Sequence, residues 1–120
     1  MCVDVLLPPA PIPSPDALKT DASLASLDAS AEAKDDARWE VGGNCNFLIA
    51  ASRLGLRAEC AGHVGDDAHG AFLVETLAAE GVPFRDLCAI ASEDAQTETL
   101  KCFVLTDGAG GHAFCSRYDL

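Results

Sequence analysis

The sequence predicts an α/β fold with an antiparallel β-sheet appended to it. Strand-like runs at residues 38–41 and 57–64 each lead through a glycine-containing turn into a segment with helical apolar spacing. After Pro83 the period changes to that of strands, at residues 85–90, 97–106 and 112–118. Alternating strands and helices followed by a β-meander are typical of the α/β class.

The first strand is predicted at residues 2–7, an apolar run that carries Asp4 at or near its end. Five prolines between residues 8 and 15 exclude both a helix and the interior of a sheet, so this stretch is predicted to be a connector.

Residues 14–37 are rich in Ala, Ser, Asp and Lys, and their only large apolar side chains are Leu18, Leu24 and Leu27. A helix is compatible with this composition, but its buried face would be thin. We expect an acidic, Ala-rich insertion that is mobile, partly helical and without chemistry of its own.

Gly42 and Gly43 form the turn between the strand at 38–41 and a helix predicted over residues 46–53. Two glycines let the backbone approach a ligand closely, and Asn44 and Asn46 can both donate and accept hydrogen bonds. Such a corner suits a polyhydroxylated ligand. An ordinary strand-to-helix turn with asparagine caps fits the same residues, and the pattern alone leaves both open.

Two further polar turns are interpreted as structural. Residues 65–67 (Gly-Asp-Asp) supply a turn and an N-cap for the helix that carries Leu73 and Leu77. Residues 107–111 are glycine-rich but end at His112 and open a strand-like run, so they are predicted to be a hairpin loop and not a phosphate-binding loop.

Composition excludes several classes of function. The 120 residues include 8 basic and 19 acidic side chains, a net charge of -11, which disfavours nucleic acid and anionic membranes as partners. The six cysteines form no CxxC pair and are predicted to be free, mostly buried thiols. The three histidines show no zinc-ligand spacing, so no metal site is expected. We expect a soluble protein of the cytoplasm or plastid.

Several separated motifs resemble one family in the order in which they occur. They are Gly-Gly-Asn-Cys-Asn at 42–46, Ala-Ala-Ser-Arg-Leu-Gly at 50–55, Gly-His-Val-Gly-Asp-Asp at 62–67 with Gly70, and Leu-Ala-Ala-Glu-Gly-Val at 77–82. Together they resemble the N-terminal region of PfkB-type (ribokinase-like) carbohydrate kinases, and they look most similar to those of plant and algal members. Asn44 and Leu48 depart from the small residues common there, which leaves the sugar unidentified.

The resemblance implies a partial ribokinase-like, Rossmann-type sheet with an antiparallel lid formed by residues 38–41 and 85–118. It implies ATP-dependent phosphorylation of a sugar or nucleoside, with the substrate bound by Asp4, Gly42, Gly43, Asn44 and Asn46. ATP and Mg²⁺ are expected for the complete family member. The nucleotide site and catalytic Asp of the family lie beyond the lid, so we expect residues 1–120 to hold no catalytic or metal-binding residue and to be inactive alone.

Two other expectations accompany this interpretation. The lid is a candidate surface for a homodimer. The alternative function is a non-catalytic module that binds a small polyol or a partner. A dinucleotide-binding enzyme is disfavoured because Gly42 and Gly43 lack GxGxxG spacing.

Overall fold

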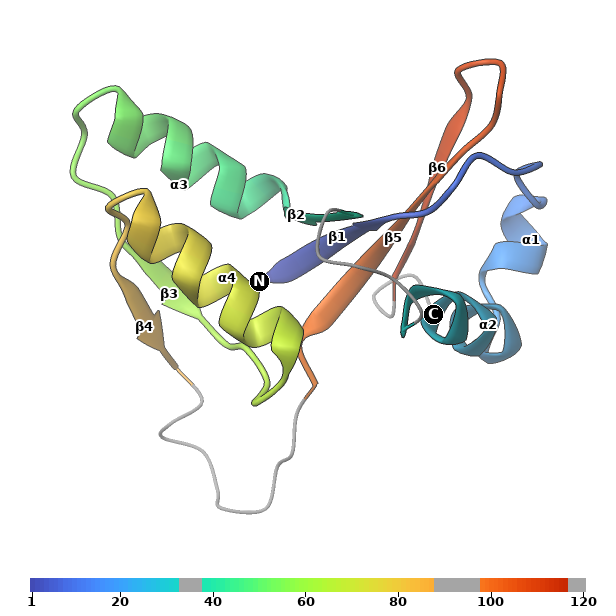
Figure 1. The fold of residues 1–120 in the computed structure, drawn as a ribbon, viewed down its shortest axis with the longest axis horizontal. Helices are drawn as coiled ribbons and strands as arrows, with labels where there is room; N and C mark the ends of the chain where they lie inside the picture. Colours follow the sequence, from blue (N-terminus) through green and yellow to red (C-terminus); the bar gives the residue numbers. More distant parts are fainter. Residues whose placement is uncertain (33–37, 88–97, 117–120) are drawn as a thin grey trace. The chain divides into compact units, whose positions relative to one another are not determined.

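The computed structural model describes residues 1–32, 38–87 and 98–116 (Figure 1). Its elements are β1 (Cys2–Leu6), α1 (Pro15–Leu18), α2 (Asp21–Glu32), β2 (Trp39–Val41), α3 (Gly43–Arg53), β3 (Cys60–Gly62), α4 (Ala68–Ala79), β4 (Phe84–Asp86), β5 (Leu100–Thr106) and β6 (His112–Ser116). One sheet has the strand order β2-β1-β5-β6, and the other pairs β3 with β4. Parallel and antiparallel pairs both occur, which confirms the predicted α/β class.

The chain divides into two compact units, which are described separately. Unit 1 comprises Met1–Val3 and Val41–Leu100, and unit 2 comprises Asp4–Glu40 and Lys101–Leu120. Unit 1 therefore holds α3, α4 and the β3-β4 sheet. Unit 2 holds α1, α2, β6 and most of the four-stranded sheet.

A β-α-β crossover is the centre of unit 1. Strands β3 and β4 are parallel, with Cys60 opposite Phe84 and Gly62 opposite Asp86. A parallel pair needs a crossover connection, which α4 provides. Leu73 and Leu77 lie one helical turn apart on the same face of α4, and both are fully buried.

The prediction that a lid-like meander begins at residue 85 is wrong for its first strand. Residues 84–86 form β4, which pairs in parallel with β3 and does not join the antiparallel strands. Apolar periodicity reports a strand but not its partner, which explains the error. Residues 88–90 of that predicted strand lie outside the described residues.

The antiparallel hairpin of unit 2 agrees with the prediction for β5 and β6. Phe103 lies opposite Cys115, and Thr106 lies opposite His112. In the loop, the Asp107 carboxylate accepts hydrogen bonds from the backbone N-H groups of Ala109 and Gly111 at 2.8 and 2.7 Å. Residues 107–111 therefore form a hairpin turn, as predicted. Residues 97 and 117–118 of the predicted strands lie outside the described residues.

The described part of the acidic insertion is helical and packed. Leu18 and Leu24 are buried, at 6% and 5% exposure. The Lys101 ammonium on β5 pairs with the Asp28 carboxylate on α2 at 2.5 Å. The helices are therefore anchored by apolar contacts and an ion pair, although residues 33–37 of the insertion lie outside the described residues.

The proline-rich connector runs along β5. The backbone N-H groups of Leu7 and Ala10 donate to the carbonyls of Val104 and Thr106, at 3.1 and 2.9 Å. The neighbouring prolines have no backbone N-H to donate, so Leu7 and Ala10 make the hydrogen bonds that pair the connector with β5. The connector ends one residue earlier than predicted, because Pro15 is the first residue of α1, a position that tolerates the missing N-H.

Close backbone approach requires glycine at position 70. A Cβ there would collide with the carbonyl oxygen of Gly65 and would lie 2.9 Å from the Thr99 hydroxyl oxygen. We expect Gly70→Ala to lower the free energy of unfolding by about 1–3 kcal/mol, as overpacking does. Urea denaturation followed by circular dichroism measures this change.

The matched control is Gly43→Ala, in the first turn of α3. A Cβ at Gly43 meets no atom of the described residues within 4 Å. Its stability should be unchanged or slightly raised, because alanine favours helices. Equal stability of the two variants would contradict the packing described around Gly70.

Candidate functional site

The glycine turn at residues 42–46 joins β2 to α3 in unit 1. Helix α3 begins at Gly43, three residues earlier than predicted, with Gly42 as its N-cap. The N-H of Gly42 donates to the carbonyl of Cys2 at 3.0 Å, and the carbonyl of Gly42 accepts the first helical bond from Asn46 at 3.0 Å. Gly43, Asn44 and Asn46 are therefore in the first helical turn and not in a loop before it.

The Asn46 side chain is fixed by a bond that points back along the chain. Its amide Nδ2 donates to the carbonyl oxygen of Val41 at 2.8 Å. This carbonyl precedes the helix, so the bond orients the side chain without capping a helical N-H. An amide offers two N-H donors and one acceptor oxygen, so one of its three groups is used here. The alternative of asparagine caps is not what the structure shows, because the N-cap is Gly42 and makes no side-chain bond.

Gly43, Asn44 and Asn46 are exposed, whereas Cys45 between them is buried. The first N-H groups of a helix have no intrahelical acceptor, so this turn presents backbone donors beside amide side chains. The arrangement can bind oxygen atoms of a small polar ligand. The structure brings four of the five predicted site residues together, namely Gly42, Gly43, Asn44 and Asn46.

Asp4 lies on β1 in unit 2 and is described apart from the other four. It is the third of five strand residues, in the middle of β1, which corrects the prediction that it stands at or near the strand's end. Val3 and Val5 are fully buried, whereas Asp4 is half-buried on the opposite face. Side-chain burial alternates along β1 because one face of the strand is apolar. The short apolar run in the sequence did not indicate where β1 stops pairing with its neighbouring strands.

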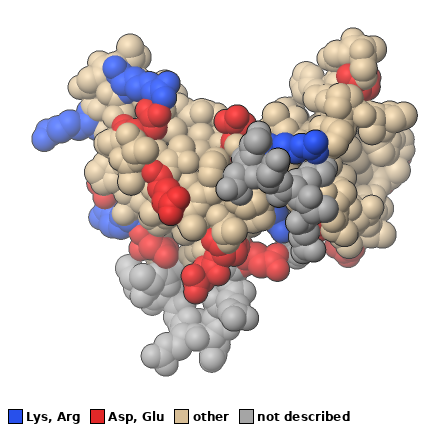
Figure 2. All heavy atoms as spheres, in the orientation of Figure 1, with Lys and Arg blue, Asp and Glu red and all other residues tan. Residues whose placement is uncertain are grey.

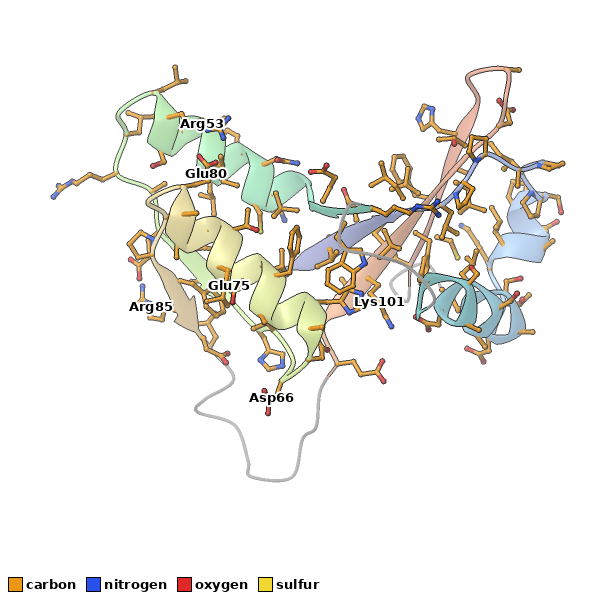
Figure 3. The ribbon with its side chains drawn as sticks, in the orientation of Figure 1. Arg53, Asp66, Glu75, Glu80, Arg85 and Lys101 are labelled. Carbon is orange, nitrogen blue, oxygen red and sulfur yellow. The ribbon has the colours of Figure 1, made fainter. Side chains whose placement is uncertain are left out.

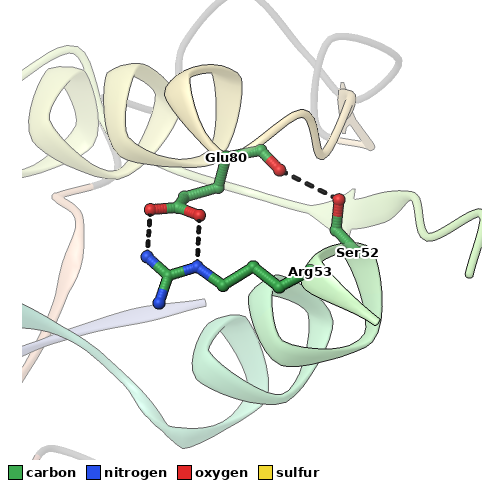
Figure 4. Close-up of polar contacts among 3 residues, drawn as sticks. All are labelled: Ser52, Arg53 and Glu80. Carbon is green, nitrogen blue, oxygen red and sulfur yellow. Dashed lines mark hydrogen bonds and ion pairs between the residues drawn. The ribbon is translucent and has the colours of Figure 1, made fainter. Parts of the chain in front are cut away.

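Helix α3 is held against α4 by a polar contact at their C-terminal ends (Figure 4). The Arg53 guanidinium donates to both carboxylate oxygens of Glu80, Nε to Oε2 at 2.7 Å and Nη2 to Oε1 at 2.5 Å. The Ser52 hydroxyl donates to the Glu80 carbonyl at 2.9 Å. Arg53 and Glu80 also point toward one another in Figure 3. The hydrogen bond from Arg53 lowers the pKa of the Glu80 carboxyl. Sequence patterns did not predict this contact, since its partners are 27 residues apart.

Asp67 joins three segments of unit 1. Its carboxylate accepts from the N-H of Gly70 at 2.8 Å, as the N-cap of α4, and from the N-H of Thr99 at 2.7 Å. The Thr99 hydroxyl in turn accepts from the N-H of Gly65 at 2.9 Å. The predicted capping role of residues 65–67 is thereby confirmed and assigned to Asp67. Asp66, labelled in Figure 3, is exposed in the turn before α4.

The electrostatics of Asp67 follow from these contacts. Desolvation by burial disfavours the charged form, but the N-H groups of Thr99 and Gly70 outweigh it and hold the pKa of Asp67 below its usual value. The ionised cap therefore stabilises the fold, and its stabilisation depends on pH.

A histidine-aspartate pair at the β3-β4 sheet was missed by sequence reasoning. His63 follows β3, Asp86 ends β4, and His63 Nδ1 lies 3.2 Å from Asp86 Oδ1. Both stand at the carboxyl ends of parallel strands, where open α/β sheets bind ligands. The sequence signal for this pair is a polar residue at the end of each strand. It was missed because residues 85–90 were interpreted as an antiparallel strand, which would not place Asp86 beside His63.

The described cysteines agree with the prediction of free thiols. Cys45, Cys60 and Cys115 are buried, and Cys2 and Cys102 are partly exposed. Burial raises the pKa of Cys45 to about 11, so its thiol is protonated at neutral pH. Cys88 lies outside the described residues. Within residues 1–32, 38–87 and 98–116, no group of three or more His, Cys, Asp or Glu side chains could hold a metal ion.

Acidic side chains outnumber basic ones in the sequence, 19 to 8. On the face drawn in Figure 2, acidic side chains are spread over several elements. None of the helices in the described parts of the chain is long and apolar enough to cross a membrane.

Removal of the Asp67 carboxylate tests the cap. We expect Asp67→Ala to lose about 2 kcal/mol of unfolding free energy, since a cap is lost and the Thr99 N-H is left without its acceptor. Asp66→Ala, at the exposed neighbour, should change little. Chemical denaturation of both variants measures the difference, and equal losses would contradict the network.

The pH dependence of the same cap has a defined sign. Because the folded pKa is depressed, the carboxylate's stabilisation is present above the unfolded value of about 3.9 and is lost as pH falls through the folded value. The stability gap between wild type and Asp67→Asn should be constant from about pH 5 to pH 8 and shrink below about pH 4. A gap that stays constant down to about pH 2 would contradict it.

Comparison with solved structures supports the fold. An uncharacterized sugar kinase from Pyrococcus horikoshii matches at a TM-score of 0.61 and 22% identity, over 99% of this chain and 33% of that one. A fructokinase from Xylella fastidiosa matches at a TM-score of 0.57 and 20% identity, over 97% of this chain and 29% of that one. A carbohydrate kinase from Agrobacterium tumefaciens matches at a TM-score of 0.56 and 16% identity, over 98% of this chain and 32% of that one. The chain thus spans about a third of the length of these proteins.

No curated protein matches the chain. A model of one protein family does match, over residues 12–116, and its description is the pfkB family carbohydrate kinase. This range includes the glycine turn, the Asp67 cap and the antiparallel hairpin. The predicted resemblance is confirmed, although the likeness to plant and algal members stays a prediction. The chain belongs to the pfkB family of carbohydrate kinases.

Proposed function

We propose that this chain supplies the acceptor-binding part of an ATP-dependent carbohydrate or nucleoside kinase. Gly43, Asn44 and Asn46 bind hydroxyl groups of the substrate at the start of α3, and Gly42, which is buried and bonded to Cys2 and Asn46, shapes the turn that presents them. Asp4 contributes a carboxylate that accepts hydrogen bonds from two hydroxyls. The family membership supports the class of reaction, and the geometry of the glycine turn supports the residues.

The observation that carries the proposal is the glycine at position 43. A Cβ there would meet no described atom within 4 Å, and the backbone is not in the left-handed region. Gly70, by contrast, is required by packing, and Gly55 and Gly81 have positive φ angles of 83° and 69°. The fold explains these three glycines but not Gly43. A ligand that approaches the backbone of α3 explains it.

Oriented hydrogen bonds suit the chemistry of the family. Phosphoryl transfer depends mainly on holding the acceptor hydroxyl in line with the donor and on neutralising charge. The Asn46 amide is already oriented by Val41, so its remaining donor and acceptor groups are fixed before a ligand arrives. Such preorganisation reduces the entropic cost of binding.

ATP and Mg²⁺ serve the family in general. The described residues contain no group of three or more His, Cys, Asp or Glu side chains that could hold a metal ion, so we assign this chain no part in holding Mg²⁺. Its proposed contribution is binding and orientation of the acceptor.

The β5-β6 hairpin is proposed as a lid that covers the acceptor and excludes water, which would limit hydrolysis of ATP. Phe114 on this hairpin is exposed, at 57%. The His112 ring packs edge-to-face against the Phe114 ring, with the two ring centroids 5.5 Å apart. The edge of β6 is also the proposed contact for a homodimer.

Substitution of the glycine turn tests the proposal. Gly43→Ala adds a methyl group where the ligand would lie, and we expect acceptor affinity to fall about tenfold, which corresponds to about 1.4 kcal/mol. Asn46→Ala and Asp4→Asn should each weaken acceptor binding by a similar factor. Calorimetric titration with a panel of sugars and nucleosides measures affinity without ATP.

The control is Asp66→Asn, an exposed change outside the glycine turn. Unchanged acceptor affinity in folded Gly43→Ala, Asn46→Ala and Asp4→Asn proteins would refute the assignment. ATP-dependent phosphorylation of the same panel separates the two functions. Binding without turnover supports an acceptor-binding part or a polyol-binding module, and turnover by this chain would show that it holds its own catalytic base.

A further inference from the structure

Three sulfur atoms converge inside unit 1, away from the exposed residues of the glycine turn. The Met1 thioether lies 2.8 Å from the Cys60 thiol and 3.7 Å from the Cys45 thiol. Both thiols therefore contact the same thioether sulfur. We refer to Met1, Cys45 and Cys60 as the sulfur cluster.

The cluster is assembled from three segments that are far apart in sequence. Met1 precedes β1, Cys45 lies in the first turn of α3, and Cys60 opens β3. Cys45 and Cys60 are 1% and 4% exposed. Gly62 leaves room for the thioether, since a Cβ at that position would lie 3.0 Å from Met1 Cγ.

The spacing suits a small soft metal ion. Metal-thiolate bonds of about 2.3 Å in a trigonal plane place the sulfur atoms about 4 Å apart. The Met1-Cys45 pair already has this separation within a few tenths of an ångström. The Met1-Cys60 pair would have to open by about 1 Å, which a flexible thioether allows.

We propose that the sulfur cluster is a binding site for a thiophilic d¹⁰ ion, with Cu(I) as the representative ion. Two thiolates and a thioether are the soft ligands that select Cu(I) over hard cations such as Mg²⁺. Each thiol releases its proton to solvent as its sulfur binds the ion, and no atom changes oxidation state. This site is independent of the proposed kinase function.

Competition with a coloured Cu(I) chelator under anaerobic, reducing conditions tests the site. The folded wild-type chain should bind one Cu(I) tightly. Cys45→Ser and Cys60→Ser should each weaken binding by about 100-fold or more, since loss of outer contacts alone costs 10–100-fold. Cys102→Ser, in unit 2, is the matched control and should bind as wild type does. Unchanged Cu(I) affinity in the Cys45 and Cys60 variants would overturn the proposal.

A second measurement uses the wild-type chain, so it does not require any variant to fold. Met1 is the only methionine in the chain, so selenomethionine labels this position alone. X-ray absorption at the copper edge should detect one selenium and two sulfur neighbours. Copper without a selenium neighbour, or with fewer than two sulfur neighbours, would contradict the site.

Discussion

The Asp67 carboxylate is the contact on which the arrangement of unit 1 depends. It caps α4 through Gly70 and also holds the backbone of Thr99, whose hydroxyl binds the turn at Gly65. The absent side chain of Gly70 allows these segments to approach. Helix α4 is the crossover between β3 and β4, so the contact that starts this helix lies within the β-α-β unit.

The proposed acceptor site, at the start of α3, also depends on α4. Contacts of Arg53 and Ser52 with Glu80 fasten the end of α3 to the end of α4, and the bond from Gly42 to Cys2 fixes the other end of α3 beside the first strand. The glycine turn is thus supported from both sides. Rigid support leaves the exposed amides oriented, which is what binding of a hydroxylated ligand requires.

Much of this architecture follows from the sequence. Glycines and turn residues placed α3 and α4 closely enough to identify the family, and the hairpin loop followed from Asp107 and its glycines. Partners of strands did not follow: β4 was interpreted as antiparallel because a three-residue strand has the same period in either pairing. The position of Asp4 and the His63-Asp86 pair were missed for a related reason, since both depend on where neighbouring strands end.

The most direct test of the central claim is a nuclear magnetic resonance titration of the folded, isotopically labelled chain with a panel of sugars and nucleosides. The account predicts that one class of ligand shifts the backbone amides of Gly43, Asn44 and Asn46 and the side-chain amide of Asn46, and that Gly43→Ala weakens this response. Shifts that arise only elsewhere in the chain, or an equal response in Gly43→Ala, would contradict it.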